Sequence, residues 1–281
     1  MNDTAVRADL MGRAPLRPLA AVRRMMGRTA RSMLRRAAAR IETRVPLPVA
    51  RALRRVQFEW YLQRTHRRSA KRARTLDAAR PLRLNLGSGF HPKPGWINID
   101  LCEDAADLQL DLREPLPFPD ASADFVYSEH FVEHLSYPNL ADSTAWELES
   151  PQARSEALTL LRECHRVLRP GGRLDVVVPD AERILDAYAA RRERPFVHED
   201  WWGPQWCDTP MHRVNYLFRQ GTEHRYAYDF ETLRRVLEAV GFTDVERRSF
   251  DPELDHRNAT RSLFVRATKG DSRKGGTGAA A

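Results

Sequence analysis

The sequence predicts an α/β fold in which a mostly parallel sheet carries helices on both faces. Two observations predict it: short apolar runs alternate with segments of helical spacing, and glycine-containing turns separate them. The first run is residues 82–86, where Leu82, Leu84 and Leu86 alternate with polar residues. The chain has 281 residues and is 42% hydrophobic. It can therefore hold one domain of about 200 residues with a substantial core, plus an appendage.

The turn after this first strand is suited to a ligand. Gly87 and Gly89 permit positive φ and let a ligand approach the backbone closely. Ile97 and Ile99 then carry a second strand to Asp100, whose carboxylate can accept hydrogen bonds from both hydroxyls of a ribose. The order of strand, glycine turn, strand and acid predicts a site for a nucleoside.

The rest of the chain continues the alternation of strands and helices. Further strands are expected at residues 108–111, 124–128, 174–178, 245–250 and 261–268. Helices are expected before Val167, over residues 179–192, and over residues 229–240, where Gly241 ends the last one. Only ten residues separate Gly89 from Asp100, and they include two prolines, so a full first helix does not fit there.

This order of motifs resembles the class I S-adenosylmethionine-dependent methyltransferases, especially the type 11 group and relatives with the signature L-N-L-G-S-G…G-W-I-N-I-D. The resemblance covers residues 81–268 and implies a Rossmann-like sheet of seven strands whose last strand is antiparallel. It also implies S-adenosylmethionine as the cofactor. The residues it assigns to this cofactor are Gly87, Ser88 and Gly89 for the methionine part, Asp100 for the ribose, Asp111 and Leu112 for the adenine, and Ser128 and Glu129 beside the sulfonium.

The implied reaction transfers a methyl group to a small-molecule acceptor or to a glycan or lipid-linked acceptor, with oxygen as the expected atom. A hydroxyl acceptor benefits from a base, and His130 and His224 are the candidates because a near-neutral imidazole can take a proton. Glu133 or His134 could substitute. The insertion at residues 194–228 is rich in Trp, Tyr and His and is expected either to form a lid that stacks on the acceptor or to form a small local core.

Charge divides the chain into two parts. Residues 1–80 hold 20 Arg and 1 Lys against 5 acidic residues, a net charge of +16, whereas the remainder carries −8. Apolar residues at helical spacing predict amphipathic helices over residues 22–41 and 49–60. Such an extension could dock on an anionic membrane surface, hold nucleic acid, or pack against the acidic domain of the same chain. Residues 81–268 form the expected catalytic domain, and 269–281 a flexible tail.

Three other functions remain open. The alternative next in rank to the small-molecule methyltransferase is an RNA methyltransferase or RNA-binding protein that uses the arginine-rich extension. Another is a protein that binds S-adenosylmethionine without catalysis. The last is a zinc hydrolase, because His130-x-x-Glu133-His134 matches an inverted zinc-protease pattern. The three cysteines are far apart, so no disulfide scaffold or structural metal is expected. No apolar run approaches the roughly 20 residues of a membrane helix, which favours a cytoplasmic protein, peripheral at the membrane if the extension docks there.

Overall fold

The computed structural model describes residues 46–76, 81–136, 155–190, 204, 206–256 and 261–270. The first expected amphipathic helix, residues 22–41, lies outside them, and so do residues 271–281 of the expected tail. Trp201, Trp202 and His198 of the expected lid also lie outside the described residues. The chain divides into two units, Met1–Arg64 with Cys102–Asp104, and Thr65–Leu101 with Ala105–Ala281.

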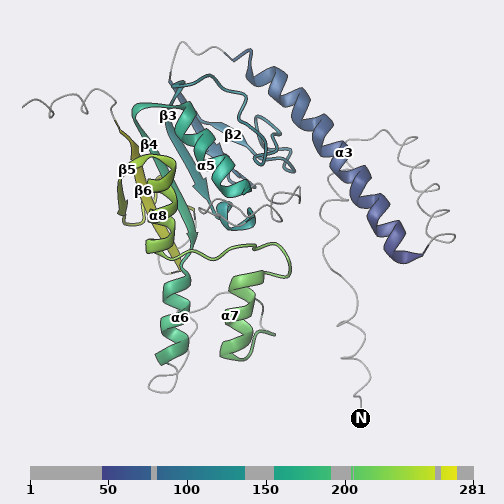
Figure 1. Cartoon of the computed structure of the whole chain (residues 1–281), viewed down its shortest axis with the longest axis vertical. Coiled ribbons are helices and arrows are strands. Elements are labelled where there is room, and N and C mark those ends of the chain that lie inside the picture. The colour runs from purple at the N-terminus through teal and green to yellow at the C-terminus, as the bar shows by residue number, and fades with distance from the viewer. Residues whose placement is uncertain are drawn as a thin grey trace, which may run out of the picture. The chain divides into compact units, whose positions relative to one another are not determined.

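A six-stranded sheet in the order β2-β1-β3-β4-β6-β5 forms the centre of the second unit (Figure 1). Its strands are β1 (Leu82–Leu86), β2 (Ile97–Ile99), β3 (Ala123–Glu129), β4 (Leu168–Pro179), β5 (Phe242–Arg247) and β6 (Ser262–Lys269). The first four run parallel, whereas β6 is antiparallel to both β4 and β5. The α/β fold and the antiparallel last strand are therefore confirmed.

Seven strands were expected, and the described residues form six. Residues 108–111 make a single bridge, between Leu108 and Ile99, instead of a strand. On the side away from β2, backbone amides of this segment bond to helix α3 (Leu47–Ala73): the amide of Gln109 donates to Ser69 Oγ at 3.1 Å, and that of Asp111 to His66 Nδ1 at 3.1 Å. Two side chains of α3 thus take the place that a strand partner would occupy.

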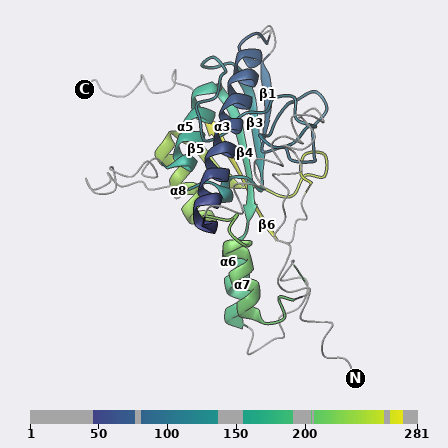
Figure 2. The same ribbon diagram turned by 90° about the vertical axis from the view of Figure 1, so that its right-hand side faces the viewer.

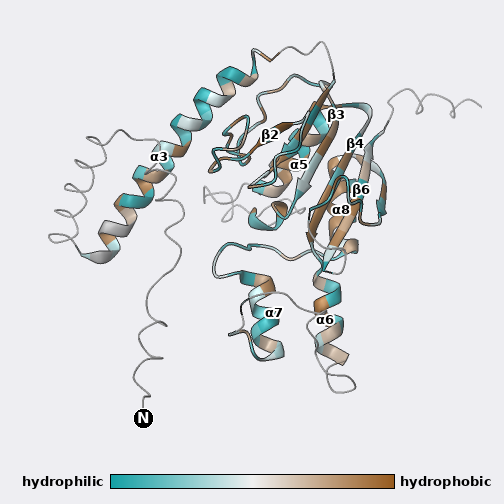
Figure 3. Ribbon diagram, turned by 180° about the vertical axis from the view of Figure 1, so that it is seen from behind, coloured by the Kyte–Doolittle hydropathy of each residue, from teal (hydrophilic) through white to brown (hydrophobic). Residues whose placement is uncertain are grey.

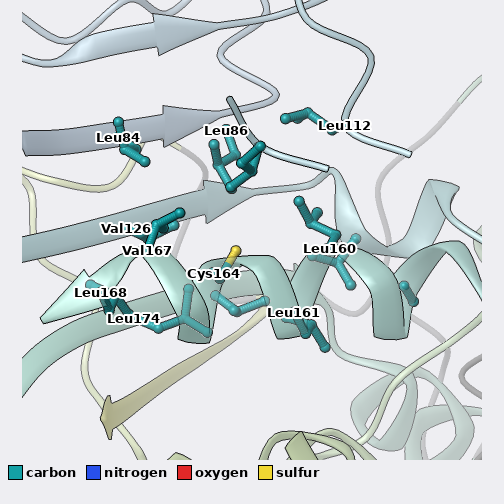
Figure 4. Packing of buried hydrophobic residues seen from close by; sticks show 14 of the residues in the cluster. Leu84, Leu86, Leu112, Val126, Leu160, Leu161, Cys164, Val167, Leu168 and Leu174 are labelled. Carbon is teal, nitrogen blue, oxygen red and sulfur yellow. The ribbon is translucent and has the colours of Figure 1, made fainter. Parts of the chain in front are cut away.

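Helices α5 (Glu156–Val167) and α8 (Phe230–Val240) cover one face of the sheet (Figure 1). Apolar residues of α5 recur three and four positions apart and are buried against Leu84, Leu86 and Val126 of the strands (Figure 4). Helix α8 begins where the Asp229 side chain accepts from the amide of Thr232. It ends at Gly241, whose φ of 112° suits glycine, as expected from the sequence.

The opposite face of the sheet is covered, within the described residues, by loops. Tyr127, Val177, Leu254 and Phe264 form a separate apolar cluster there, and Trp96 and Phe125 pack against it. Trp96 comes from the loop between β1 and β2, and Phe125 and Tyr127 come from β3. Leu254 comes from the segment before β6 and Phe264 from β6 itself. As expected from the prolines after Gly89, no helix forms between β1 and β2.

Three further helices complete the described residues. Helix α3 (Leu47–Ala73) includes the expected amphipathic segment 49–60, and in Figure 3 it alternates hydrophilic and hydrophobic residues, unlike the largely hydrophobic strands. Helices α6 (Ala181–Ala189) and α7 (Pro210–Arg219) pack on each other beyond the end of β4 (Figure 2). None of the described helices combines the length and hydrophobicity needed to cross a bilayer.

Candidate functional site

The glycine turn at the end of β1 has the conformation that its sequence predicts. Gly87 and Gly89 have φ values of +66° and +50°, a region that favours glycine. A Cβ atom on Gly87 would lie 2.6 Å from the Phe131 side chain, so no larger residue fits without displacement of that ring. The amide of Ser88 donates to the carbonyl of Ile99 at 3.0 Å, which holds the turn against the end of β2.

Asp100 lies at this turn, as the cofactor site requires. Its Oδ2 atom accepts a hydrogen bond from the amide of Gly89 at 3.1 Å. The side chain is therefore within one hydrogen bond of the turn although eleven positions separate the two residues in sequence. The structure brings together the residues assigned to the methionine part and to the ribose.

Two asparagines fix the loop that stands where a first helix would be. Asn85 Nδ2 donates to Asn98 Oδ1 at 2.9 Å across β1 and β2, and both side chains are buried. Asn98 also accepts from the amide of Lys93 at 2.6 Å and donates to its carbonyl at 3.1 Å. Because an asparagine can both donate and accept, this pair can satisfy loop backbone that no helix satisfies.

Ser88 and Ser128 end neighbouring strands, and their hydroxyls lack partners. Both oxygens are buried, and neither makes a hydrogen bond with any described residue. Leu86 and Ser128 are register partners in the β1–β3 pairing, so the two hydroxyls belong to the same edge of the sheet. Buried hydroxyls are normally satisfied, so these two atoms indicate a polar ligand at the carboxyl ends of the strands.

The two residues assigned to the adenine are engaged within the fold. Both carboxylate oxygens of Asp111 accept from Arg113, at 2.9 Å and 2.7 Å. Burial alone would raise the pKa of Asp111, but the hydrogen bonds and charge of Arg113 outweigh it and lower the pKa. Leu112 belongs to the hydrophobic core (Figure 4). An adenine amine would have to share Asp111 with Arg113, so this contact stays a prediction.

Glu129, at the end of β3, contacts a distant segment. Its carboxylate accepts from the amide of His256, with N···O distances of 3.1 and 3.2 Å. The His256 ring stacks on that of His91, with centroids 3.4 Å apart. The residue assigned to the sulfonium side is thus linked to the loop that follows the glycine turn.

The two histidines proposed as bases lie in one buried polar group. His130 has a φ of +50°, and its Nε2 is 2.9 Å from Ser262 Oγ while its Nδ1 is 3.3 Å from Glu133 Oε1. His224 Nδ1 is 2.5 Å from the carbonyl oxygen of Leu217. Burial lowers the pKa of His224, although that hydrogen bond and the charge of Glu133 oppose the shift.

The zinc-protease pattern does not form the helix that it needs. Only Val132–His134 is helical, as a single 3-10 turn, and His130 lies before it with positive φ. Two histidines therefore do not share one face of a helix, which is the arrangement that the protease mechanism uses. The motif starts a turn at the carboxyl end of β3 instead.

Sequence reasoning did not find the cavity on the loop-covered face. It has a volume of about 690 Å³. Its floor includes Trp96 and Phe125, whose ring centroids are 4.7 Å apart. The Arg83 guanidinium lies 5.7 Å from the Trp96 centroid, and that of Arg173 lies 3.8 Å from the Phe125 centroid. The sequence held no signal for this cavity, because Arg83, Phe125 and Arg173 come together only as register partners on three adjacent strands.

Residues 97–176 match a family model described as a methyltransferase domain. No curated protein matches the chain. Among solved structures, a SAM-dependent methyltransferase from Thermotoga maritima is 17% identical, with 78% of this chain and 96% of that chain covered and a TM-score of 0.37. A SAM-dependent methyltransferase from Archaeoglobus fulgidus is also 17% identical, with 75% of this chain and 94% of that chain covered and a TM-score of 0.38. One from Aquifex aeolicus is 17% identical, with 67% of this chain and 82% of that chain covered and a TM-score of 0.35.

Residues 97–176 carry the sequence of a methyltransferase domain, and the sheet and the glycine turn are compatible with S-adenosylmethionine as the methyl donor. The residues present fit the cofactor, because a Cβ on Gly89 would meet no atom within 4 Å, and two buried hydroxyls lack partners at the same edge. When bound, S-adenosylmethionine supplies an electrophilic methyl group on a sulfonium. The individual residue assignments stay predictions.

Proposed function

We propose that the enzyme methylates a hydroxyl group of a small molecule or glycan, free or lipid-linked, that carries an acidic substituent. The observation that carries this proposal is the cavity on the loop-covered face, where the cations Arg83 and Arg173 lie over aromatic rings; Asp251, Glu253 and Asp255 also line the cavity. Trp96 and Phe125 offer apolar ring surface to a sugar. Arg83 and Arg173 offer planar guanidinium groups, which bind carboxylate or phosphate through paired hydrogen bonds.

The cavity adjoins the expected cofactor site. Phe90 and His91, which line it, directly follow Gly89 of the glycine turn. His256 also lines it, and its amide donates to the carboxylate of Glu129. The residues assigned to the cofactor do not themselves line the cavity, so the acceptor has to extend from it past Phe90, His91 and His256 to meet the methyl group. Methyl transfer is a direct displacement that depends on such alignment.

His130 supports oxygen as the methylated atom. Its Nε2 already has a hydroxyl partner, Ser262 Oγ, at 2.9 Å, and its Nδ1 faces Glu133. The side chain is 6% exposed, so an acceptor hydroxyl reaches Nε2 only if the Ser262 side chain rotates away. In that position the imidazole would accept the hydroxyl proton as the methyl group is transferred.

Replacement of Trp96 by alanine tests the cavity as the acceptor site. We expect KM for the acceptor to rise about tenfold, since an aromatic contact contributes roughly 0.5–1.5 kcal/mol beyond its buried area. KM for S-adenosylmethionine should stay unchanged. The measurement is transfer of labelled methyl groups to neutral glycosides, uronic acids, sugar phosphates and lipid-linked sugars, followed by identification of the O-methyl product.

Trp206→Ala is the matched control, because Trp206 is 63% exposed and does not line the cavity. The proposal predicts an effect for Trp96→Ala alone. Equal effects of the two substitutions on acceptor KM would contradict it. Label that appears in added RNA, and in none of the hydroxyl compounds, would favour the RNA methyltransferase instead.

We also propose that α3 docks the enzyme on an anionic membrane surface. Val49, Leu53, Val56 and Trp60 follow helical spacing and are 46%, 43%, 66% and 66% exposed. The sequence of α3 adds eight Lys and Arg residues against one acidic residue. An exposed apolar row with basic flanks is typical of helices that lie in the interface of anionic bilayers, and a lipid-linked acceptor would be found there.

The apolar row gives this docking proposal a specific test. In the full chain, we expect Val56→Ala with Trp60→Ala to reduce binding to phosphatidylglycerol vesicles at least tenfold, since burial of each large apolar side chain contributes roughly 1.5–3 kcal/mol. Sedimentation with vesicles measures this binding. Met211→Ala, at a 46% exposed apolar residue of α7, is the control. Vesicle binding unchanged by the double substitution would contradict membrane docking, and tight RNA binding would then support nucleic acid as the partner.

A further inference from the structure

A cluster of three metal-ligating side chains lies at the carboxyl end of β3. Glu133 and His134 come from the turn after this strand, and His224 comes from the segment between α7 and α8. One donor atom from each lies within 4.8 Å of the other two. We call these residues the Glu133–His134–His224 cluster.

Glu133 is a buried carboxylate whose oxygens have no well-directed hydrogen-bond donor among the described residues. Its side chain is 1% exposed, and neither oxygen accepts a hydrogen bond there. The nearest nitrogens are His130 Nδ1, at 3.3 Å from Oε1, and His134 Nε2, at 3.9 Å. A buried carboxylate is costly unless a cation or donors compensate it, so Glu133 indicates a positive charge at this place.

His224 is oriented as a ligand. Its Nδ1 is 2.5 Å from the carbonyl oxygen of Leu217, and a carbonyl can only accept, so Nδ1 carries the proton. In the neutral ring Nε2 then has the free lone pair. Metal-binding histidines commonly have this arrangement, with one nitrogen bonded to a backbone carbonyl and the other directed to the ion.

The surrounding backbone already joins the two segments that contribute ligands. The main-chain carbonyl of Glu133 accepts from the amides of Arg225 and Tyr226, at 2.8 and 3.2 Å. The rings of His134 and His224 meet edge to face, with centroids 4.9 Å apart. The ligands are therefore held near one another by contacts that do not depend on an ion.

We propose that the Glu133–His134–His224 cluster binds one divalent transition-metal ion, with Zn²⁺ as the best match to two imidazoles and one carboxylate. Tetrahedral zinc with bonds of about 2.0–2.1 Å holds its donors roughly 3.4 Å apart, so the widest pair must close by about 1.4 Å. His134, with a side chain 30% exposed, is on the open side, where a water would complete the coordination.

The ion would fasten the segment before α8 to the edge of the sheet. His130 stays outside the ligand set and contacts Glu133, so it acts as a neighbour that orients the carboxylate. This differs from the zinc-protease pattern, in which His130 is a ligand and Glu133 activates water. The metal site does not rest on the identity of the methyl acceptor.

The test uses the full chain purified without a histidine tag, stripped with chelator and titrated with Zn²⁺ or Co²⁺. We expect one equivalent to bind, with a visible absorption spectrum typical of tetrahedral Co²⁺ and a higher melting temperature with Zn²⁺. Glu133→Gln and His134→Ala should each lower the affinity at least tenfold. Because His134 is partly exposed, His134→Ala also serves if Glu133→Gln fails to fold.

Controls separate this site from other metal-binding groups of the chain. His212→Ala should leave binding unchanged, because His212 is exposed and pairs with Asp208. Cys102→Ser with Cys207→Ser excludes thiolate ligands. The absence of stoichiometric binding in the wild type, or equal binding in the His134→Ala and His212→Ala variants, would overturn the proposal.

Discussion

Replacement of Asp100 by alanine is expected to weaken the binding of S-adenosylmethionine and S-adenosylhomocysteine by about 100-fold or more. Two hydrogen bonds from ribose hydroxyls to a charged carboxylate contribute roughly 1.5–3 kcal/mol each, and about 1.4 kcal/mol corresponds to a factor of ten. Asp100 also accepts from the amide of Gly89, so its loss releases one contact that holds the glycine turn. Calorimetric titration of both ligands into the purified chain measures the change.

The control is Asp104→Ala, at an exposed acid of the following loop. It removes the same charge without a predicted contact to the ribose. Equal affinities of the wild type and Asp100→Ala would show that the ribose is held elsewhere. Asp100→Asn refines the result, since the amide keeps an acceptor for the Gly89 amide and loses the charge.

Replacement of Asp175 by asparagine is expected to lower the free energy of unfolding by about 3–5 kcal/mol, the range typical when one partner of a buried ion pair is removed. Asp175 lies in β4 with a fully buried side chain. Its oxygens lie 2.8 Å from Arg248 Nε, 3.3 Å from Arg173 Nε and 3.2 Å from Arg266 Nε. Arg248 is itself 5% exposed, so it would keep Asp255 as a partner but lose half of its compensating charge.

Asp120→Asn is the matched control for Asp175→Asn. Asp120 pairs with Arg166 at 2.6 Å, but its side chain is 78% exposed. A surface pair of this kind contributes about 0–1 kcal/mol, because water already solvates both charges. Urea unfolding followed by circular dichroism measures both variants. Similar losses for the two would mean that burial does not set the strength of the Asp175 contacts.

The sequence predicted the elements whose signals are local. Helix α8 was found because its apolar spacing and the Gly241 terminus agree within a dozen positions, and the structure adds that Asp229 caps its start. The glycine turn and Asp100 were found because strand, turn, strand and acid follow one another within one short segment. Helix α3 was found from apolar spacing, since a helical period needs no partner to be visible.

The features that the sequence missed depend on contacts between distant residues. The cavity exists because Arg83, Phe125 and Arg173 become neighbours only when three strands pair in register. The Glu133–His134–His224 cluster joins residues 90 positions apart, and the sequence indicated His224 only as a candidate base. The seventh strand was expected from apolar residues at 108–111, whereas the pairing with β2 stops after the single bridge between Ile99 and Leu108.

The hydrogen bonds from Gln109 and Asp111 to α3 bear on how this chain can be shortened. Ser69 and His66 accept hydrogen bonds from backbone amides next to the edge strand β2. Ala70 and Ala73 of the same helix belong to the hydrophobic core. A fragment that began at residue 81 would leave those amides open to a strand from another molecule, which is the usual start of edge-to-edge aggregation. The last turns of α3, which include His66 and Ser69, therefore cover these amides. A minimal fragment that does not aggregate has to begin before them.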